Sequence, residues 1–545
     1  MAIQYNAEEI AMVRLLFNAD VRTLDAARPE ADALVVRDGK ILAVGREAEL
    51  RRLAGPDAVA EDMHGAVILP GLTDAHIHWE WTSLNLKRVS MFDLPTKAAA
   101  VAAVAERVRV TAPGEWITGF GWAQGPWTDT GGAFPTAADL DAVAPDNPLY
   151  LSARSGHATW VNSAAMKIAG ITAETKDSPG AELQRDAAGN PTGILLEEAS
   201  LLVARHVPKP EMLEIAERMR EAQVLAWKCG LTGIHDYDRP SAFEAMQYLH
   251  ERHELGLRVL KHVNDPHIPA AHELRLRFGF GDDWLHIGGL KIFADGALGP
   301  VTALMIDPYE GQPNNRGIAI TSKEEMMRLV PEASRHGMPS TIHAIGDKAV
   351  RDVLDVYEFT RAEEAKLGIP RSARRHRIEH VQIIHPDDVH RLAELDIIAS
   401  IQPIHATSDY PVADRYWGDR AALSYNARVQ LDRGVRVAFG SDSPVESFDP
   451  FVGIHAAVTR QRADGSPGPD GWYPEARLTV DEAIRGYTQG PAWASGMENK
   501  LGTLKEGFLA DLIVIDRDPW KIAPADLLNV KVLGTMVGGE WVWKG

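Results

Sequence analysis

Two histidines separated by a single residue, His76 and His78, follow an apolar run near the start of the chain. If this run is a β-strand, its alternate side chains point to the same side, so both imidazoles can face one ion. Neutral imidazole is a favoured ligand of zinc. Two surface histidines in a loop are the alternative interpretation, and the pair alone does not decide between them.

Two more histidines close apolar runs further along the chain. His343 ends the run 340–343, and His380 ends the run 377–380. A single histidine at the end of a strand is usually an ordinary polar residue. Finding both in order after the His-x-His pair favours one metal centre built from several strand ends.

Asp442 closes the run 438–442, in which Gly440 and Ser441 allow a close approach to the centre. A carboxylate at this place can bind a metal and accept a proton from metal-bound water. The alternative is an aspartate that caps the following helix. Taken in isolation, Asp442 would fit that alternative better, so the hypothesis depends on the histidines.

Lys291 lies inside the apolar run 287–293. A lysine in a buried strand is costly unless it is paired or chemically changed, and burial lowers its pKa. Two functional hypotheses follow: a carbamate, formed with carbon dioxide, that bridges two metals, or a Schiff base with a carbonyl substrate. A salt bridge to Asp295 is the structural alternative.

Eight short apolar runs could position these residues. They are 67–76, 231–236, 258–263, 287–293, 339–343, 377–380, 397–402 and 436–442. Helical stretches separate many of them. This alternation and count predict an α/β chain with a (β/α)8 TIM-type barrel, in which the C-terminal ends of the strands form the active site.

Both ends of the chain are typical of β structure. Asp38-Gly39 and Gly538-Gly539 each lie between apolar runs, as in hairpin turns. Isolated hairpins are marginally stable, so we expect residues 1–66 and 498–545 to form one β-sandwich around a barrel of 67–497. The stretch of about 85–225 is too long for one crossover and predicts an inserted subdomain after the first barrel strand, with a lid over the pocket as its hypothetical role.

Composition narrows the class of partner. The formal net charge of −19 disfavours nucleic acid, which requires a basic face. The single cysteine, Cys229, excludes an intrachain disulfide and suits the cytoplasm. We find no secretory signal and no apolar run of the ~20 residues that a membrane span needs. We therefore expect a cytoplasmic protein that acts on a small molecule without nucleic acid or membrane partners, and a homodimer as the commonest assembly.

The set His76, His78, Lys291, His343, His380 and Asp442, in that order, resembles the amidohydrolase superfamily. The surrounding sequence is similar to its YtcJ-like or amidohydrolase-3 family, which includes N-substituted formamide deformylases. The similar segments are 70–78, 291–296, 343–347, 377–380 and 440–445, together with the tail segments 502–504 and 510–514.

The resemblance implies that His76, His78 and Asp442 hold one metal and that His343 and His380 hold a second. Carboxylated Lys291 would bridge the two. Zinc is the expected ion, one or two per chain, with iron or manganese as substitutes.

The activity that the resemblance implies is metal-dependent hydrolysis of an amide-type C–N bond. Metal-activated hydroxide would attack the carbonyl, and Asp442 would accept the proton and pass it to the leaving nitrogen. His157, in a segment similar to a motif that borders the family's pocket, would stabilise the oxyanion. A loop histidine without such a role is the alternative.

Six residues are assigned to substrate binding: Trp79, Trp81, Trp122, Trp160, Asp295 and Gln402. The tryptophans favour an aromatic or apolar substrate, although tryptophans also fill cores.

Four rival functions stay open. Deaminases of the superfamily often carry Glu three residues after the fifth-strand histidine, where this chain has Gly346 followed by Asp347. An ester or lactone hydrolase would use the same hydroxide. A lyase with Lys291 as Schiff-base nucleophile would leave the histidines unexplained, and a binding protein on this scaffold would show no turnover.

Overall fold

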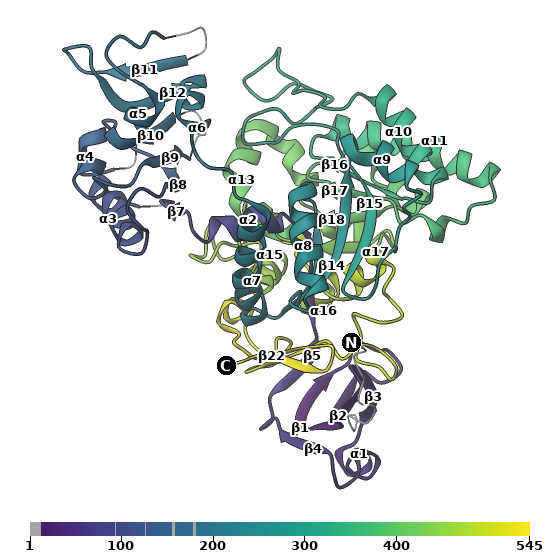
Figure 1. The fold of residues 1–545 in the computed structure, drawn as a ribbon. Coiled ribbons are helices and arrows are strands. Elements are labelled where there is room, and N and C mark those ends of the chain that lie inside the picture. Colours follow the sequence, from purple (N-terminus) through teal and green to yellow (C-terminus); the bar gives the residue numbers. More distant parts are fainter. Residues whose placement is uncertain (1–11, 93, 126, 155–157, 178–180) are drawn as a thin grey trace. The chain divides into compact units, whose positions relative to one another are not determined.

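The computed structural model describes residues 12–92, 94–125, 127–154, 158–177 and 181–545 (Figure 1). These residues form two compact units. The larger unit combines the described residues up to Thr82 with Ala216–Gly545, and the smaller one is Ser83–Ile215. Within the described ranges, no helix combines the length and apolarity that a membrane span requires.

The core of the larger unit is an eight-stranded parallel sheet. Its strands are β6 (Leu72–Ile77), β13 (Leu231–Asp236), β14 (Arg258–Asn264), β15 (Leu285–Phe293), β16 (Ser340–Ala344), β17 (Arg377–His380), β18 (Ile398–Ile401) and β19 (Val437–Phe439). Each strand pairs with the next in chain order, and a parallel bridge between Ile77 and Ser443 brings the last strand's end to the first. The predicted barrel is confirmed, and each of the eight apolar runs overlaps one of its strands.

Burial on both faces explains why these runs are so apolar. β13, β16, β17 and β18 are buried along their whole length, as is typical of parallel barrel strands with helices outside them. The helices that follow the strands are α7 (Met212–Lys228), α8 (Pro240–Glu251), α9 (Ile268–Glu273), α10 (Lys323–Arg335), α11 (Asp347–Lys366), α12 (Arg391–Leu395), α13 (Pro403–Trp417), α14 (Ala427–Leu431), α15 (Pro450–Thr459), α16 (Val480–Gly486) and α17 (Gln489–Ser495).

The two ends of the chain share a second eight-stranded sheet. It contains β1 (Arg14–Arg22), β2 (Glu30–Arg37), β3 (Lys40–Gly45), β4 (Val59–Asp62), β5 (Val67–Pro70), β20 (Leu512–Ile515), β21 (Val532–Val537) and β22 (Glu540–Lys544). β5 pairs antiparallel with β20, which joins the two ends. Both predicted turns are hairpins, with positive φ at Asp38 (54°), Gly39 (72°), Gly538 (58°) and Gly539 (81°).

The first apolar run divides between the two sheets. Its first part, β5, belongs to the terminal sheet, and only β6 enters the barrel. Gly71 lies at the junction, where an added Cβ would be 2.3 Å from Thr232 Oγ1. The close approach of this junction to β13, on which Thr232 lies, therefore requires glycine at this position.

The smaller unit has its own sheet and core. Its elements are β7 (Val89–Ser90), α3 (Lys97–Val108), β8 (Ile117–Trp122), α4 (Ala137–Asp141), β9 (Leu149–Ala153), β10 (Ala158–Val161), α5 (Ser163–Ala169), β11 (Ala181–Arg185), β12 (Pro191–Glu197) and α6 (Leu201–Ala204). Trp122 and Trp160 are fully buried in this core, and each indole donates a 2.8 Å hydrogen bond to a backbone carbonyl. Their placement corrects the assignment to substrate binding, because packing accounts for both side chains. The role of this unit as a lid stays a prediction.

Candidate metal centre

A cavity of about 340 Å³ lies at the C-terminal ends of the barrel strands. Five of the predicted metal ligands line it: His76, His78, His343, His380 and Asp442. They come from β6 and the residue after it, from β16 and β17, and from the segment after β19, so residues more than 300 positions apart in the chain meet here. This is the end of the barrel at which active sites form in this fold.

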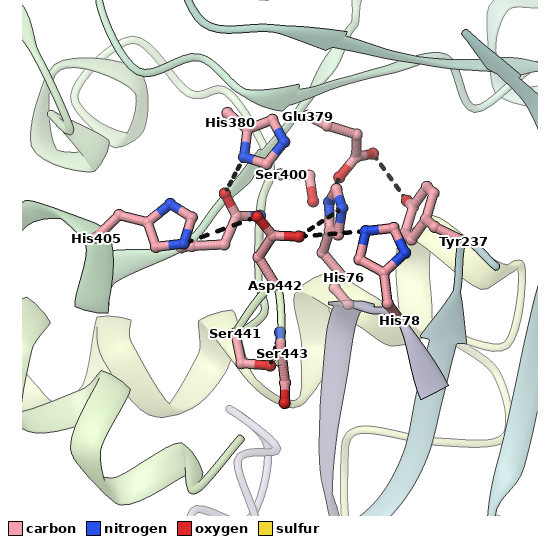
Figure 2. A network of polar contacts seen from close by, with 12 residues as sticks. His76, His78, Tyr237, Glu379, His380, Ser400, His405, Ser441, Asp442 and Ser443 are labelled. Carbon is pink, nitrogen blue, oxygen red and sulfur yellow. Dashed lines mark hydrogen bonds and ion pairs between the residues drawn. The ribbon is translucent and has the colours of Figure 1, made fainter. Parts of the chain in front are cut away.

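Three of these residues converge on one point (Figure 2). The Nε2 atoms of His76 and His78 each lie 3.4 Å from Asp442 Oδ1. The ligand atoms of all three lie within 4.8 Å of one another, which is close enough for them to share one ion. Two imidazoles and a carboxylate are ligands that suit zinc. The residues therefore fit a divalent metal.

The chain bends sharply to bring Asp442 there. An added Cβ at Gly440 would lie 2.4 Å from the His76 backbone nitrogen, so only glycine allows this approach. Asp442 itself has φ 60°, and His380 has φ 76°, in the left-handed region that side chains other than glycine rarely adopt. Backbone strain of this kind is concentrated at functional sites, where the surrounding structure holds it.

Carboxylates on the far side of the imidazoles fix their tautomers. Glu379 Oε2 lies 2.7 Å from His76 Nδ1, and Asp238 Oδ1 lies 3.0 Å from His78 Nδ1. Each carboxylate accepts the Nδ1–H, which leaves Nε2, the nitrogen that faces Asp442, as the ligand atom for a metal. Glu379 is in turn held by Arg377 Nε at 2.5 Å and by the Tyr237 hydroxyl at 2.9 Å.

The electrostatics suit cation binding. Burial and the nearby Lys291 amine lower the pKa of His76 to about 4 and that of His343 to about 3, so both are neutral ligands at pH 7. Burial also lowers the pKa of His78, but Asp238 and Asp442 outweigh it and raise that pKa to about 10. The two carboxylates thus keep His78 protonated at pH 7, and a metal cation bound between His78 and Asp442 would replace this proton.

The other two histidines are also fixed by their second ring nitrogen. His380 Nδ1 lies 2.8 Å from Gln402 Oε1, and His343 Nε2 lies 2.9 Å from the Gly296 carbonyl oxygen. His380 therefore keeps Nε2 as its ligand atom and His343 keeps Nδ1. The ring centroids of the two histidines are 4.5 Å apart. Gln402 orients His380, which gives it a role other than the substrate contact that we predicted.

Lys291 is buried beside these histidines without a partner. Its Nζ has no hydrogen bond among the described residues and lies 4.4 Å from the centre of the Tyr237 ring. Burial lowers the pKa of Lys291 to about 8. The salt bridge to Asp295 is wrong, because that carboxylate accepts hydrogen bonds from the backbone amides of Leu304, Ile345 and Gly346. An unpaired buried amine with a lowered pKa fits chemical modification.

The remaining predicted residues have different places. Trp79 is fully buried, and its backbone amide donates to Asp236 Oδ1 at 2.9 Å, so it packs in the core. Trp81 is 46% exposed, and its ring centroid lies 6.0 Å from that of His78, which leaves it available to a substrate. Asp295 is fully buried, and its carboxylate accepts the three backbone hydrogen bonds described above. His157 lies outside the described residues.

Sequence reasoning missed three residues of the site: Asp238, Glu379 and His405. His405 groups with His380 and Asp442 as a second possible set of metal ligands. It lies three residues beyond Gln402, at which the seventh apolar run was taken to end. A histidine in the first turn of the helix after a barrel strand was the available signal.

The carboxylate behind His78 gives a testable prediction. We expect Asp238→Asn to weaken zinc affinity by about 10- to 100-fold, because an amide holds the Nδ1–H less strongly than a carboxylate. Zinc titration with a competing chelator would measure this. Asp282→Asn is the matched control, because Asp282 contacts His250 at 2.7 Å on the surface of the larger unit. Equal zinc affinity in both variants would contradict the assigned role of Asp238.

Comparison with known proteins agrees with this geometry. The sequence model described as the amidohydrolase family matches residues 60–543. The chain is 32% identical to the YtcJ protein of Bacillus subtilis, over 94% of this chain and 96% of that protein. It is also 32% identical to N-substituted formamide deformylase of Arthrobacter pascens, over 96% of this chain and 97% of that protein. The crystal structure of an uncharacterized metal-dependent hydrolase from Pyrococcus horikoshii matches with a TM-score of 0.77 and 25% identity, over 94% of this chain and 99% of that one.

Proposed function

The chain belongs to the amidohydrolase family, and from that premise we propose that it is a metal-dependent hydrolase of an amide-type C–N bond in a small molecule. The observation that carries the proposal is the convergence of His76, His78 and Asp442 in a cavity beside the unpaired Lys291 amine. Zinc is the proposed ion, because the donor set is rich in imidazole.

Two metal positions follow from the donor atoms. His76, His78 and Asp442 would hold the first ion, and His343 and His380 the second. Lys291, as a carbamate, would bridge them. A bound divalent ion supplies a water of lowered pKa and polarises the substrate carbonyl.

The chain's own residues supply the rest of the reaction. Asp442 accepts the proton of the attacking water and gives it to the leaving nitrogen, which makes the amine a good leaving group. Asp442 is ionised, as a proton acceptor must be: burial alone would raise its pKa, but the imidazoles of His76 and His78 hold it well below the usual value. Glu379 and Asp238 keep the histidines in the tautomer that this arrangement needs.

The cavity wall suggests the class of substrate. Apolar side chains line it beside the histidines: Phe293, Leu298, Ile345 and Val445. Apolar walls favour a substrate that carries an apolar or aromatic substituent. Because one relative is named for N-substituted formamides, these compounds form the first panel to test. Esters and lactones of the same shape form the second, because the same attack can cleave them.

Metal removal tests the proposal directly. We expect purified protein to contain one or two zinc ions per chain by elemental analysis, and dialysis against a chelator to abolish amide hydrolysis. Zinc should restore activity and raise the melting temperature, because it binds the folded chain. Full activity in protein shown to be free of metal would refute the proposal. Activity on esters alone would leave a metal hydrolase but reject the amide substrate.

A further inference from the structure

His405 faces the cavity but has no assigned part in the reaction. It lies in the first turn of α13 and is only 5% exposed. Its Nε2 is 3.8 Å from Asp442 Oδ2, on the side of Asp442 away from His78 (Figure 2). Among the described residues, this nitrogen has no hydrogen-bond partner. A buried polar atom without a partner is costly, so its retention at a reaction centre requires a reason.

The neighbours of the ring indicate where its proton lies. Gln382 Nε2 lies 3.2 Å from His405 Nδ1 and is placed to donate to it. A ring nitrogen that accepts from an amide carries a lone pair, so the proton of neutral His405 lies on the other nitrogen, Nε2, which faces Asp442. The contact with Gln382 therefore distinguishes His405 from His76 and His78. A protonated nitrogen donates a hydrogen bond but cannot bind a metal.

We propose that His405 is a catalytic residue whose Nε2–H donates a hydrogen bond to the acyl oxygen of the substrate. The inference rests on the proposed function. Attack on the carbonyl carbon places negative charge on this oxygen, and a fixed donor in a buried cavity stabilises that charge more than it stabilises the neutral carbonyl. The N-terminus of α13, in which His405 lies, adds the positive end of a helix dipole at the same place.

This assignment separates His405 from the other histidines of the cavity. His76, His78 and His380 each contact an acceptor through Nδ1, which leaves Nε2 as the nitrogen available to a metal. His405 has the opposite arrangement, because its Nδ1 faces the amide nitrogen of Gln382. The grouping of His405 with His380 and Asp442 therefore describes a substrate donor beside the metal ligands and not a third metal position.

The test uses His405→Phe, which keeps ring volume without a donor, and His405→Gln, which restores an N–H. For the Phe variant we expect kcat to fall by about 10²- to 10³-fold with KM within a few-fold of the wild type. Zinc per chain should be unchanged. The affinity of an alkylphosphonate, a tetrahedral anion that mimics the attacked carbonyl, should fall by at least about tenfold. The Gln variant should recover part of both losses. His455→Phe, which removes a buried histidine of α15, is the control for repacking.

Three results would overturn the inference. Loss of zinc from His405→Phe would make His405 a metal ligand. An unchanged kcat would leave it without a part in the reaction. A loss that His405→Gln does not recover, with unchanged phosphonate affinity, would make it a packing residue. If the wild-type protein hydrolysed no amide or ester, the proposed function would fail, and phosphonate affinity with zinc content would still decide the role of His405.

Discussion

Asp442→Asn is expected to lower kcat by about 10⁴-fold while the barrel stays folded. Asparagine has nearly the same shape, so the packing around residue 442 is preserved. It has no negative charge to hold a cation against His76 and His78, and its amide cannot take a proton from the attacking water. Both functions assigned to Asp442 are therefore lost in one substitution.

The measurements for this variant are kcat, zinc per chain and the circular dichroism melting curve. Retained zinc with lost activity would identify the proton transfer as the larger contribution, and lost zinc would identify ligation. Asp449→Asn is the matched control: Asp449 caps α15 by accepting from the Phe451 amide at 2.9 Å, so its loss should affect stability and spare kcat. The assignment of Asp442 fails if its Asn variant keeps kcat within tenfold of the wild type.

The positions of these ligands were predictable because the barrel places them by rule. Parallel strands buried on both faces give long apolar runs, and their C-terminal ends meet at one end of the barrel. His76, His343 and His380 each end or nearly end such a run, so local pattern and fold pointed to the same place. Asp442 was ambiguous by itself, since an aspartate after a strand more often caps a helix.

The residues behind the ligands could not be predicted in this way. Glu379 contacts His76 across 303 positions of sequence, and Asp238 contacts His78 across 160. Such pairs depend on how the barrel strands are placed in three dimensions, and no local sequence pattern encodes that placement. His405 was missed for a related reason, because a strand-based search stops where the apolar run ends.

The tryptophans show the opposite error, in which a local pattern was given too much weight. Trp79 directly follows His78, but the chain has already left β6 and begun α2 (Trp79–Asn85), so the alternation of the strand no longer applies. Its side chain turns into the core. Trp122 and Trp160 pack within the smaller unit, where large aromatic side chains supply much of the buried apolar area.

The lysine of the fourth strand carries the second large prediction. Lys291→Ala is expected to lower kcat by about 10³-fold and to reduce the zinc content to one ion or fewer, because the bridging carbamate of the proposed site is lost. The space left by the side chain would admit a small carboxylate, which has the same two oxygen donors as a carbamate. Added acetate or propionate should therefore restore part of the activity. Carboxylate titration of kcat, with zinc analysis at each concentration, measures both effects.

A buried lysine with a different environment provides the control for rescue. Lys261 lies on β14 and forms a 2.8 Å ion pair with Asp236, so its loss leaves no bridging position for a carboxylate to fill. Lys261→Ala should not be rescued by acetate if the inference about Lys291 is correct, and equal rescue of both variants would show a general effect of the added salt. Absence of rescue together with full zinc content in Lys291→Ala would reject the carbamate.

The pH at which the carbamate forms follows from the lowered pKa of Lys291, which is about 8. Carbon dioxide reacts with the neutral amine and not with the ammonium form, and the neutral fraction rises as pH passes upward through the pKa. Metal-free protein given zinc at a constant concentration of dissolved carbon dioxide should therefore regain activity slowly below about pH 7 and fastest above about pH 9. Stopped aliquots assayed at one fixed pH separate this loading step from catalysis. His78, whose pKa is about 10, must also lose a proton before it binds zinc, so loading without carbon dioxide is the control. A loading rate that does not change with pH, or that is the same without carbon dioxide, would contradict carboxylation of Lys291.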